Sequence, residues 1–153
     1  MHDKDFDLEA FLPYRLNRAA ELVGLRFAAK YKELYGLTRP EWRTLAALGS
    51  SGRLTATEIG IHSTMHKTKV SRAVFSLEQY RWLKRSEDER DRRSEHLELS
   101  AAGVRAYKEL TDLARDYQAE LQEALGPAGI KALSTGLDAV ESAFGSTRKR
   151  SGV

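Results

Sequence analysis

A dense run of charged side chains, EDERDRR, occupies residues 87–93 and contains four acids and three arginines. The arginine guanidinium is a planar fork of N–H donors that matches the oxygens of a phosphate group. An arginine on a narrow loop can also enter the minor groove of DNA, where the negative potential favours its insertion. Arg90, Arg92 and Arg93 are therefore candidate contacts to a nucleic acid, and a simple solvated turn is the alternative.

The acids of the same run have a separate interpretation. Arginines without a partner at a mobile loop tip would sample many rotamers. A neighbouring acid could fix the direction in which their guanidinium groups point. We expect Asp91 to form a salt bridge that orients an arginine and contributes little stability at an exposed site. Glu87, Asp88 and Glu89 are expected to be plain solvated charge.

A second cluster, KTKVSR, lies at residues 67–72. A helix in the major groove presents side chains to bases from its N-terminal turns. Thr68, Lys69, Ser71 and Arg72 are the candidate base readers, with Lys67 as a phosphate contact. Arg72 suits guanine best because its fork can bond two acceptors. The alternative is that these residues form the solvent-exposed face of an ordinary amphipathic helix.

The elements that must position these clusters follow from local signals. Apolar spacings of three and four predict a long helix over residues 11–35. Capping boxes at Thr38–Glu41 and Thr55–Glu58 open a second helix and a short third one, and a fourth covers residues 66–79. Short strands at 81–85 and 96–99 enclose the charged run as a hairpin. Ser100 caps a fifth helix, which breaks at residues 126–127 before a sixth.

This order predicts a mainly α fold with a small two-stranded β wing (α+β class). It is a winged helix-turn-helix with N- and C-terminal helices that form a dimerisation region. We assign the dimerisation region to residues 6–36 and 101–145 and the winged helix-turn-helix to residues 37–100. Residues 146–153 are expected to be a disordered basic tail.

The wing resembles the DxRxxxxxLT signature of MarR-type transcriptional regulators, with Asp91, Arg93, Leu99 and Ser100 at the matching positions. The TKVSR run at 68–72, followed by Leu-Glu at 77–78, is similar to the recognition helix of that family. Ser100 replaces the usual threonine, and His66 stands where a better N-cap is usual. By motif position the resemblance assigns Arg93 to the minor groove, with Arg90 and Arg92 on phosphates or as alternates.

The resemblance also implies a small-ligand pocket for an aromatic or lipophilic acid. Arg15 and Arg18, with Trp42 nearby, are the candidate ligand residues, and an intersubunit salt bridge is the alternative for Arg15. The implied function is a homodimeric, sequence-specific regulator of double-stranded DNA that reads a palindromic operator, a repressor rather than an activator. A winged-helix module that binds an acidic protein partner is the alternative function.

Composition sets the remaining limits. The formal charge is only +3, but residues 67–93 hold nine Lys or Arg against five acids, whereas residues 101–145 hold four against seven. There is no cysteine for a disulfide or a thiolate zinc site, and no apolar run long enough for a membrane span. With an acidic N-terminus, the chain is expected to be cytoplasmic, without a membrane partner.

Catalytic and metal sites are not expected. No phosphate loop, nucleophile elbow or paired catalytic carboxylates are present, so we expect no enzyme activity and no cofactor. Glu58, His62 and His66 are spaced four apart and could bind zinc on a continuous helix. The turn between the two histidines makes this metal-sensing alternative weak.

Overall fold

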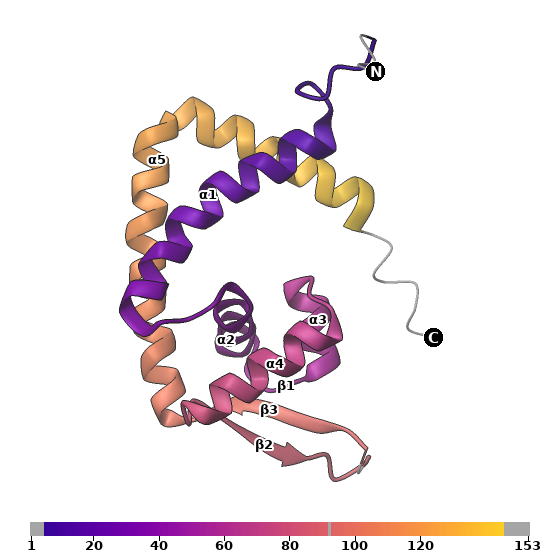
Figure 1. The fold of residues 1–153 in the computed structure, drawn as a ribbon, viewed down its shortest axis with the longest axis vertical. Helices are drawn as coiled ribbons and strands as arrows, with labels where there is room; N and C mark the ends of the chain where they lie inside the picture. Colours follow the sequence, from indigo (N-terminus) through magenta and orange to yellow (C-terminus); the bar gives the residue numbers. More distant parts are fainter. Residues whose placement is uncertain (1–4, 92, 146–153) are drawn as a thin grey trace. The chain divides into compact units, whose positions relative to one another are not determined.

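A computed structural model describes residues 5–91 and 93–145, which form two compact units that divide between residues 113 and 114. The elements of the first unit are shown in Figure 1. They are α1 (Leu12–Tyr35), α2 (Arg39–Ser51), β1 (Leu54–Thr55), α3 (Ala56–Ser63), α4 (Lys67–Gln79), β2 (Leu83–Glu87), β3 (Glu95–Leu99) and the start of α5 (Ala101–Phe144). The second unit is the remainder of α5.

Local capping fixes the start of α2 and α3. The Thr38 hydroxyl accepts from the Glu41 N–H at 3.4 Å, and the Glu41 carboxylate accepts from the Thr38 N–H at 3.0 Å. Thr55 and Glu58 repeat this reciprocal pair at 3.2 and 2.7 Å. Both predicted capping boxes are confirmed, so α2 and α3 begin where the sequence predicts that they begin.

The helix-turn-helix consists of α3, a tight turn and α4. Thr64 ends α3 in the left-handed conformation, with φ 56°, and its N–H bonds the Gly60 carbonyl. Helix α4 then begins one residue after His66 and buries Val70, Val74 and Leu77 in the core. Figure 1 shows α2, α3 and α4 gathered on one side of the hairpin.

The sheet has three strands, in the order β1-β3-β2, and not the two that the sequence predicts. Strands β2 and β3 pair antiparallel with Leu83 opposite Leu99 and Arg85 opposite Leu97. The extra strand, β1, places Leu54 opposite Leu97 on the other side of β3. Leu97 is 2 % exposed, because the middle strand is covered from both edges and by the helices.

Helix α5 begins on a sequence-encoded cap. The Ser100 hydroxyl accepts from the Gly103 N–H at 3.1 Å and donates to the Arg81 carbonyl at 2.7 Å, which confirms the predicted N-cap. Within the second unit Gly126 leaves helical geometry, with φ 69° and ψ 169°, and Pro127 follows it. The predicted break between a fifth and a sixth helix therefore lies at the expected residue, inside α5.

Candidate nucleic-acid interface

Helix α4 presents a polar and basic face to solvent. All five residues predicted as DNA contacts on this helix lie in its first two turns and are exposed: Lys67, Thr68, Lys69, Ser71 and Arg72. The opposite side of the helix is anchored by Val70, Val74 and Leu77, which fixes the rotation of α4 about its axis. Among the described residues, none of the three cations has an ion-pair partner, so their charges are available to a ligand.

A basic hollow borders the N-terminus of α4. It encloses about 250 Å³ and is lined by Arg39, Pro40, Arg43, Thr64, Met65, His66 and Lys69. The His66 side chain makes no capping bond, so the first N–H groups of α4 keep no side-chain acceptor there. Sequence reasoning missed Arg43, because only the packing of α2 beside α4 brings it to this point. Its position within a well-capped helix carries no local signal.

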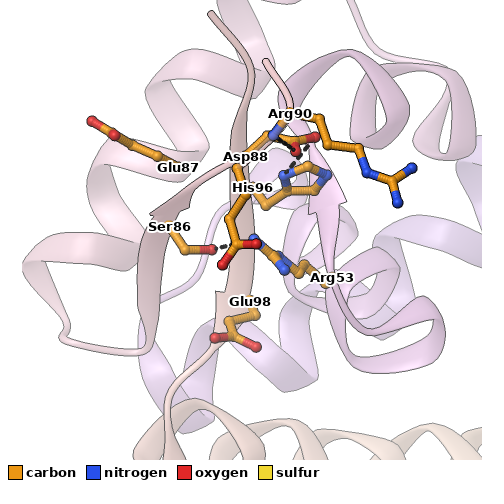
Figure 2. A pocket seen from close by; sticks show the side chains of 8 residues that line it. Arg53, Ser86, Glu87, Asp88, Arg90, His96 and Glu98 are labelled. Atoms are coloured by element: carbon orange, nitrogen blue, oxygen red, sulfur yellow. Dashed lines mark hydrogen bonds and ion pairs between the residues drawn. The ribbon is translucent and has the colours of Figure 1, made fainter. Parts of the chain in front are cut away.

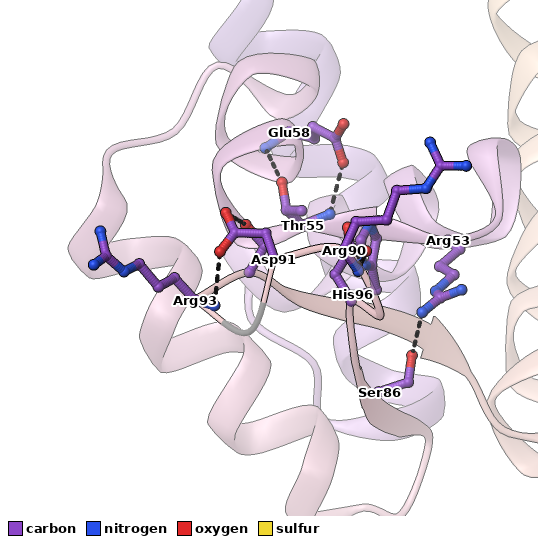
Figure 3. A network of polar contacts seen from close by, with 10 residues as sticks. Arg53, Thr55, Glu58, Ser86, Arg90, Asp91, Arg93 and His96 are labelled. Carbon is purple, nitrogen blue, oxygen red and sulfur yellow. Dashed lines mark hydrogen bonds and ion pairs between the residues drawn. The ribbon is translucent and has the colours of Figure 1, made fainter.

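The wing tip is shaped by two aspartates that act in the same way, Asp88 (Figure 2) and Asp91 (Figure 3). Asp88 Oδ1 accepts from the Arg90 backbone N–H at 2.9 Å, and Asp91 Oδ1 accepts from the Arg93 backbone N–H at 3.0 Å. Each is a side-chain turn in which an aspartate bonds the N–H two residues later. The Asp91 carboxylate also accepts from the Ser94 hydroxyl at 3.3 Å.

Two expectations about these acids were wrong. Asp91 does not hold the Arg93 guanidinium; it holds the backbone N–H of that residue, and the Arg93 side chain extends away from it in Figure 3. Asp88 is not plain solvated charge, because its carboxylate is half-buried and bonds the loop. The guanidinium groups of Arg90 and Arg93 have no ion-pair partner within the described part of the chain, and Arg92 lies outside it.

The base of the wing contains an open hollow of about 540 Å³, shown in Figure 2. Arg53, from the segment between α2 and β1, donates to the Ser86 hydroxyl at 2.9 Å. His96 Nδ1 lies 3.8 Å from Asp88 Oδ2 and makes no hydrogen bond with any residue that the structure describes. Four carboxylates and two arginines line this hollow, together with Ser86 and His96, so its lining is of mixed charge.

One arginine ties the wing to the end of α4. Arg85 on β2 pairs with Glu78 of α4 at 2.5 Å and with Glu95 of β3 at 2.7 Å. The hydrogen bond from Arg85 lowers the pKa of the Glu78 carboxyl, and the two carboxylates raise the pKa of Arg85. The Arg85 guanidinium therefore already has two partners within the protein. It links α4, the helix with the candidate base-reading residues, to the hairpin.

A second arginine ties α1 to α2. Arg39 pairs with Glu21 at 2.8 Å, and this bond raises the pKa of the Arg39 guanidinium. The guanidinium lies against Gly24, where a Cβ atom would stand 2.8 Å from Nη2. The absence of a side chain at Gly24 thus lets Arg39 reach across the face of α1.

The three residues proposed as ligand contacts lie in two places. Arg18 pairs with Glu9 and stands over the Tyr14 ring, 5.7 Å from its centroid, and Arg15 is exposed on the same end of α1. Trp42 packs on Phe27, at a centroid distance of 5.2 Å. Phe27 is twelve residues beyond Arg15, about 18 Å along the helix at 1.5 Å per residue. No described contact joins either arginine to Trp42.

The described residues contain neither a metal-binding cluster nor a helix suited to a membrane. No group of three or more His, Asp or Glu side chains among them is arranged to hold a metal ion. Glu58, one of the three residues weighed as zinc ligands, bonds the Thr55 N–H in its capping box. In the same part of the chain no helix combines the length and the apolar character that crossing a bilayer requires.

Comparison with known proteins supports the geometry of this region. The family model described as MarR family matches residues 35–94, which hold the helix-turn-helix, β2 and the charged loop of the wing, but not β3. The chain is 26 % identical over 110 residues to the uncharacterized HTH-type transcriptional regulator YwoH of Bacillus subtilis (strain 168). That match covers 72 % of this chain and 79 % of YwoH.

Solved structures extend the likeness over most of the chain. The MarR family transcriptional regulator SPO1453 from Silicibacter pomeroyi DSS-3 has a TM-score of 0.74 and 27 % identity, with 89 % of this chain and 99 % of that one covered. Bordetella bronchiseptica BpsR, whose DNA binding is regulated by 6-hydroxynicotinic acid, has a TM-score of 0.70 and 19 % identity, with 83 % and 98 % covered. Residues 35–94 thus match the MarR family model, and the chain shares the winged helix-turn-helix fold of MarR family transcriptional regulators over most of its length.

Proposed function

We propose that this protein binds double-stranded DNA in a sequence-specific way and regulates transcription, as a repressor. The observation that carries the proposal is the presence, on one winged helix-turn-helix, of two basic surfaces whose cations have no ion-pair partner among the described residues. The first is the outward face of α4, with Lys67, Lys69 and Arg72, and the second is the wing tip, with Arg90 and Arg93. A helix face of this kind suits the major groove and a narrow hairpin suits the adjacent minor groove.

Each residue then has a role. Thr68, Lys69, Ser71 and Arg72 read base edges, with Arg72 on guanine, and Lys67 holds a phosphate. Arg93 enters the minor groove, while Arg90 and Arg92 hold phosphates. Asp91 supports the loop that carries Arg93. To this set we add Arg43 and His66, which line the basic hollow at the N-terminus of α4 and suit a further phosphate.

A homodimer is the form in which two such surfaces read a palindrome. Apolar side chains remain exposed on both units, among them Phe11 (45 %) and Leu12 (65 %) in the first and Leu133 (46 %) and Leu137 (42 %) in the second. A second copy of the chain would cover them. Half-sites are expected about 34–36 Å apart, one turn of DNA. Sedimentation analysis should give a dimer, and Leu137→Glu should shift it toward monomer.

An aromatic acid is the proposed effector class, because the DNA binding of BpsR responds to 6-hydroxynicotinic acid. Arg15 is a better carboxylate partner than Arg18, since Arg18 already pairs with Glu9. If a ligand acts here, it must bind the DNA-free and DNA-bound forms with different affinity. Salicylate titrated against the protein–DNA complex should release DNA, and Arg15→Ala should weaken this release more than Arg18→Ala.

Selection of random duplexes at two salt concentrations tests the main proposal. Recovery of an inverted repeat, with affinity lost in Arg93→Ala but kept in Lys131→Ala, would support it. Lys131 is an exposed lysine of the second unit, so its loss changes the net charge equally. Retention of every duplex at low salt and none at high salt would mean that the arginines only hold phosphates. The protein would then be better described as a module for an acidic partner.

A further inference from the structure

An aromatic side chain stands on the outward face of α4. Phe75 is 62 % exposed, whereas the buried face of this helix is made by Val70, Ala73, Val74 and Leu77. Single exposed apolar side chains are ordinary on protein surfaces, so exposure alone carries no conclusion. What distinguishes Phe75 is its position relative to the polar residues of the same helix.

Phe75 lies at the C-terminal end of the row of candidate base-reading residues on α4. Thr68, Ser71, Arg72 and Phe75 follow the i, i+3, i+4, i+7 spacing that places residues on one side of a helix. The same four residues, with Ser76, line one open hollow of about 550 Å³. Long side chains on a helix lean toward its N-terminus, so the ring extends over the turn of Ser71 and Arg72. The ring therefore belongs to the same surface as the hydroxyl and guanidinium groups.

The chemistry of the ring limits what it can contact there. A phenyl ring has no N–H or O–H to offer a phosphate, and Lys67, Lys69 and Arg72 already supply donors on this helix. The major-groove edges of the bases carry one apolar substituent, the 5-methyl group of thymine. Burial of the ring against a methyl group removes apolar surface of both partners from water, which is favourable.

From this position and chemistry, we infer that Phe75 contacts the 5-methyl group of a thymine in each half-site and sets the base preference there. The inference rests on the proposed DNA-binding function and names a specificity-determining residue for it. Phe75 would read the methyl group two turns along the helix from Thr68, while Arg72 reads guanine nearby. A thymine and a guanine close together in each half-site are the sequence features that this helix favours.

Deoxyuridine substitution tests the inference directly, because it removes the methyl group and keeps every hydrogen-bonding atom of the base. Each thymine of the selected duplex is replaced in turn, and the dissociation constant is measured for the wild type, Phe75→Ala and Phe75→Leu. The wild type should lose about three- to fivefold in affinity at one thymine per half-site, the effect expected for burying one methyl-sized group. Phe75→Ala should bind the thymine duplex more weakly and be indifferent to this replacement. Phe75→Leu, which keeps an apolar side chain, should retain part of the preference.

The outcomes separate the inference from the function on which it rests. In two outcomes the wild type selects a duplex but the role of Phe75 is wrong, and the DNA-binding function stands. In the first, Phe75→Ala loses as much affinity at that uracil as the wild type does. In the second, no uracil substitution changes the affinity of the wild type. Weaker binding by Phe75→Ala that is equal at every position would place the ring on sugar and backbone, which also overturns the inference. If the wild type prefers no duplex, both proposals fail. Circular dichroism checks that each variant is folded, as expected for a residue outside the core.

Discussion

The carboxylate of Asp91 accepts a hydrogen bond from the backbone N–H of Arg93 at 3.0 Å. This bond fixes the path of the loop and leaves the guanidinium of Arg93 free to reach a ligand. Asp88 does the same for Arg90 three residues earlier. Asp88 and Asp91 therefore shape the backbone that carries Arg90 and Arg93, which gives two of the wing's carboxylates a structural role in a loop that we propose contacts DNA.

The first prediction separates a backbone role of Asp91 from an ionic one. Asp91→Asn keeps an oxygen that can accept the Arg93 N–H, whereas Asp91→Ala does not. Both changes remove the same charge. We expect Asp91→Ala to bind the selected duplex about two- to tenfold more weakly than Asp91→Asn, the range for one lost hydrogen bond. Equal affinities in a fluorescence anisotropy titration would contradict the backbone role.

The second prediction concerns the salt dependence of DNA binding. If Arg90 holds a phosphate, Arg90→Ala should reduce the slope of log affinity against log salt by about 1, because one fewer counterion-releasing contact remains. Affinity should fall uniformly across duplex sequences. Lys131→Ala, on the exposed surface of the second unit, is the control and should leave the slope unchanged. A slope equal to that of the wild type would exclude Arg90 as a phosphate contact.

The third prediction follows from the ion pair between Glu78 and Arg85. The pKa of Glu78 is lowered in the folded protein, so the pair stabilises the fold above the ordinary carboxyl pKa of 4.5, and this contribution is lost as pH falls through the lowered value. Glu78→Gln should lower the free energy of unfolding by about 0.2–1 kcal/mol at pH 7, because the groups are partly solvated. Urea unfolding at pH 7 and pH 3 should show the difference shrink at the lower pH. A constant difference would refute the ionic contribution.

The fourth prediction uses the hydroxyl of Tyr35, which donates to the Glu109 carboxylate at the start of α5. This bond raises the pKa of Tyr35 from 10.0 to about 12. The folded state therefore holds this proton more tightly than the unfolded chain. The resulting stability is present below pH 10 and is lost as pH rises toward 12. Tyr35→Phe should abolish this part of the alkaline decline, measured as the urea midpoint at pH 9 and pH 11.5. An equally steep decline in the variant would contradict the assignment.

The fifth prediction compares two glycines of α5. A Cβ on Gly103 would stand 2.0 Å from the Trp82 carbonyl oxygen, whereas a Cβ on Gly136 would meet no atom within 4 Å. Gly103→Ala should destabilise the protein by about 1–3 kcal/mol or more, since the backbone must shift. Gly136→Ala should stabilise its helix by up to about 1 kcal/mol. Thermal melting measures both, and equal shifts would mean that the close approach at Trp82 is not a constraint.

The sequence by itself determined the helices, their caps and the candidate reading face. Thr38 with Glu41 and Thr55 with Glu58 are pairs three residues apart, so their effect is complete within one helical turn. The apolar spacing that buries Val70, Val74 and Leu77 also fixes which side of α4 faces solvent. Such signals depend on near neighbours alone, and reading them requires no knowledge of distant contacts. The wing hairpin follows for the same reason, because its strands are close in sequence.

Only the tertiary structure decided the contacts between segments far apart in the chain. A strand of two residues, Leu54–Thr55, has no periodicity to recognise and exists because β3 offers it an unpaired edge. Arg43 reaches the N-terminus of α4 through the packing of α2, and Arg53 reaches Ser86 through the sheet. Whether Asp91 bonds a guanidinium or a backbone N–H also depends on the conformation of the loop. For each of these groups, the alternative contact partners differ only slightly in interaction energy. Which partners come within reach is settled only when the chain has folded.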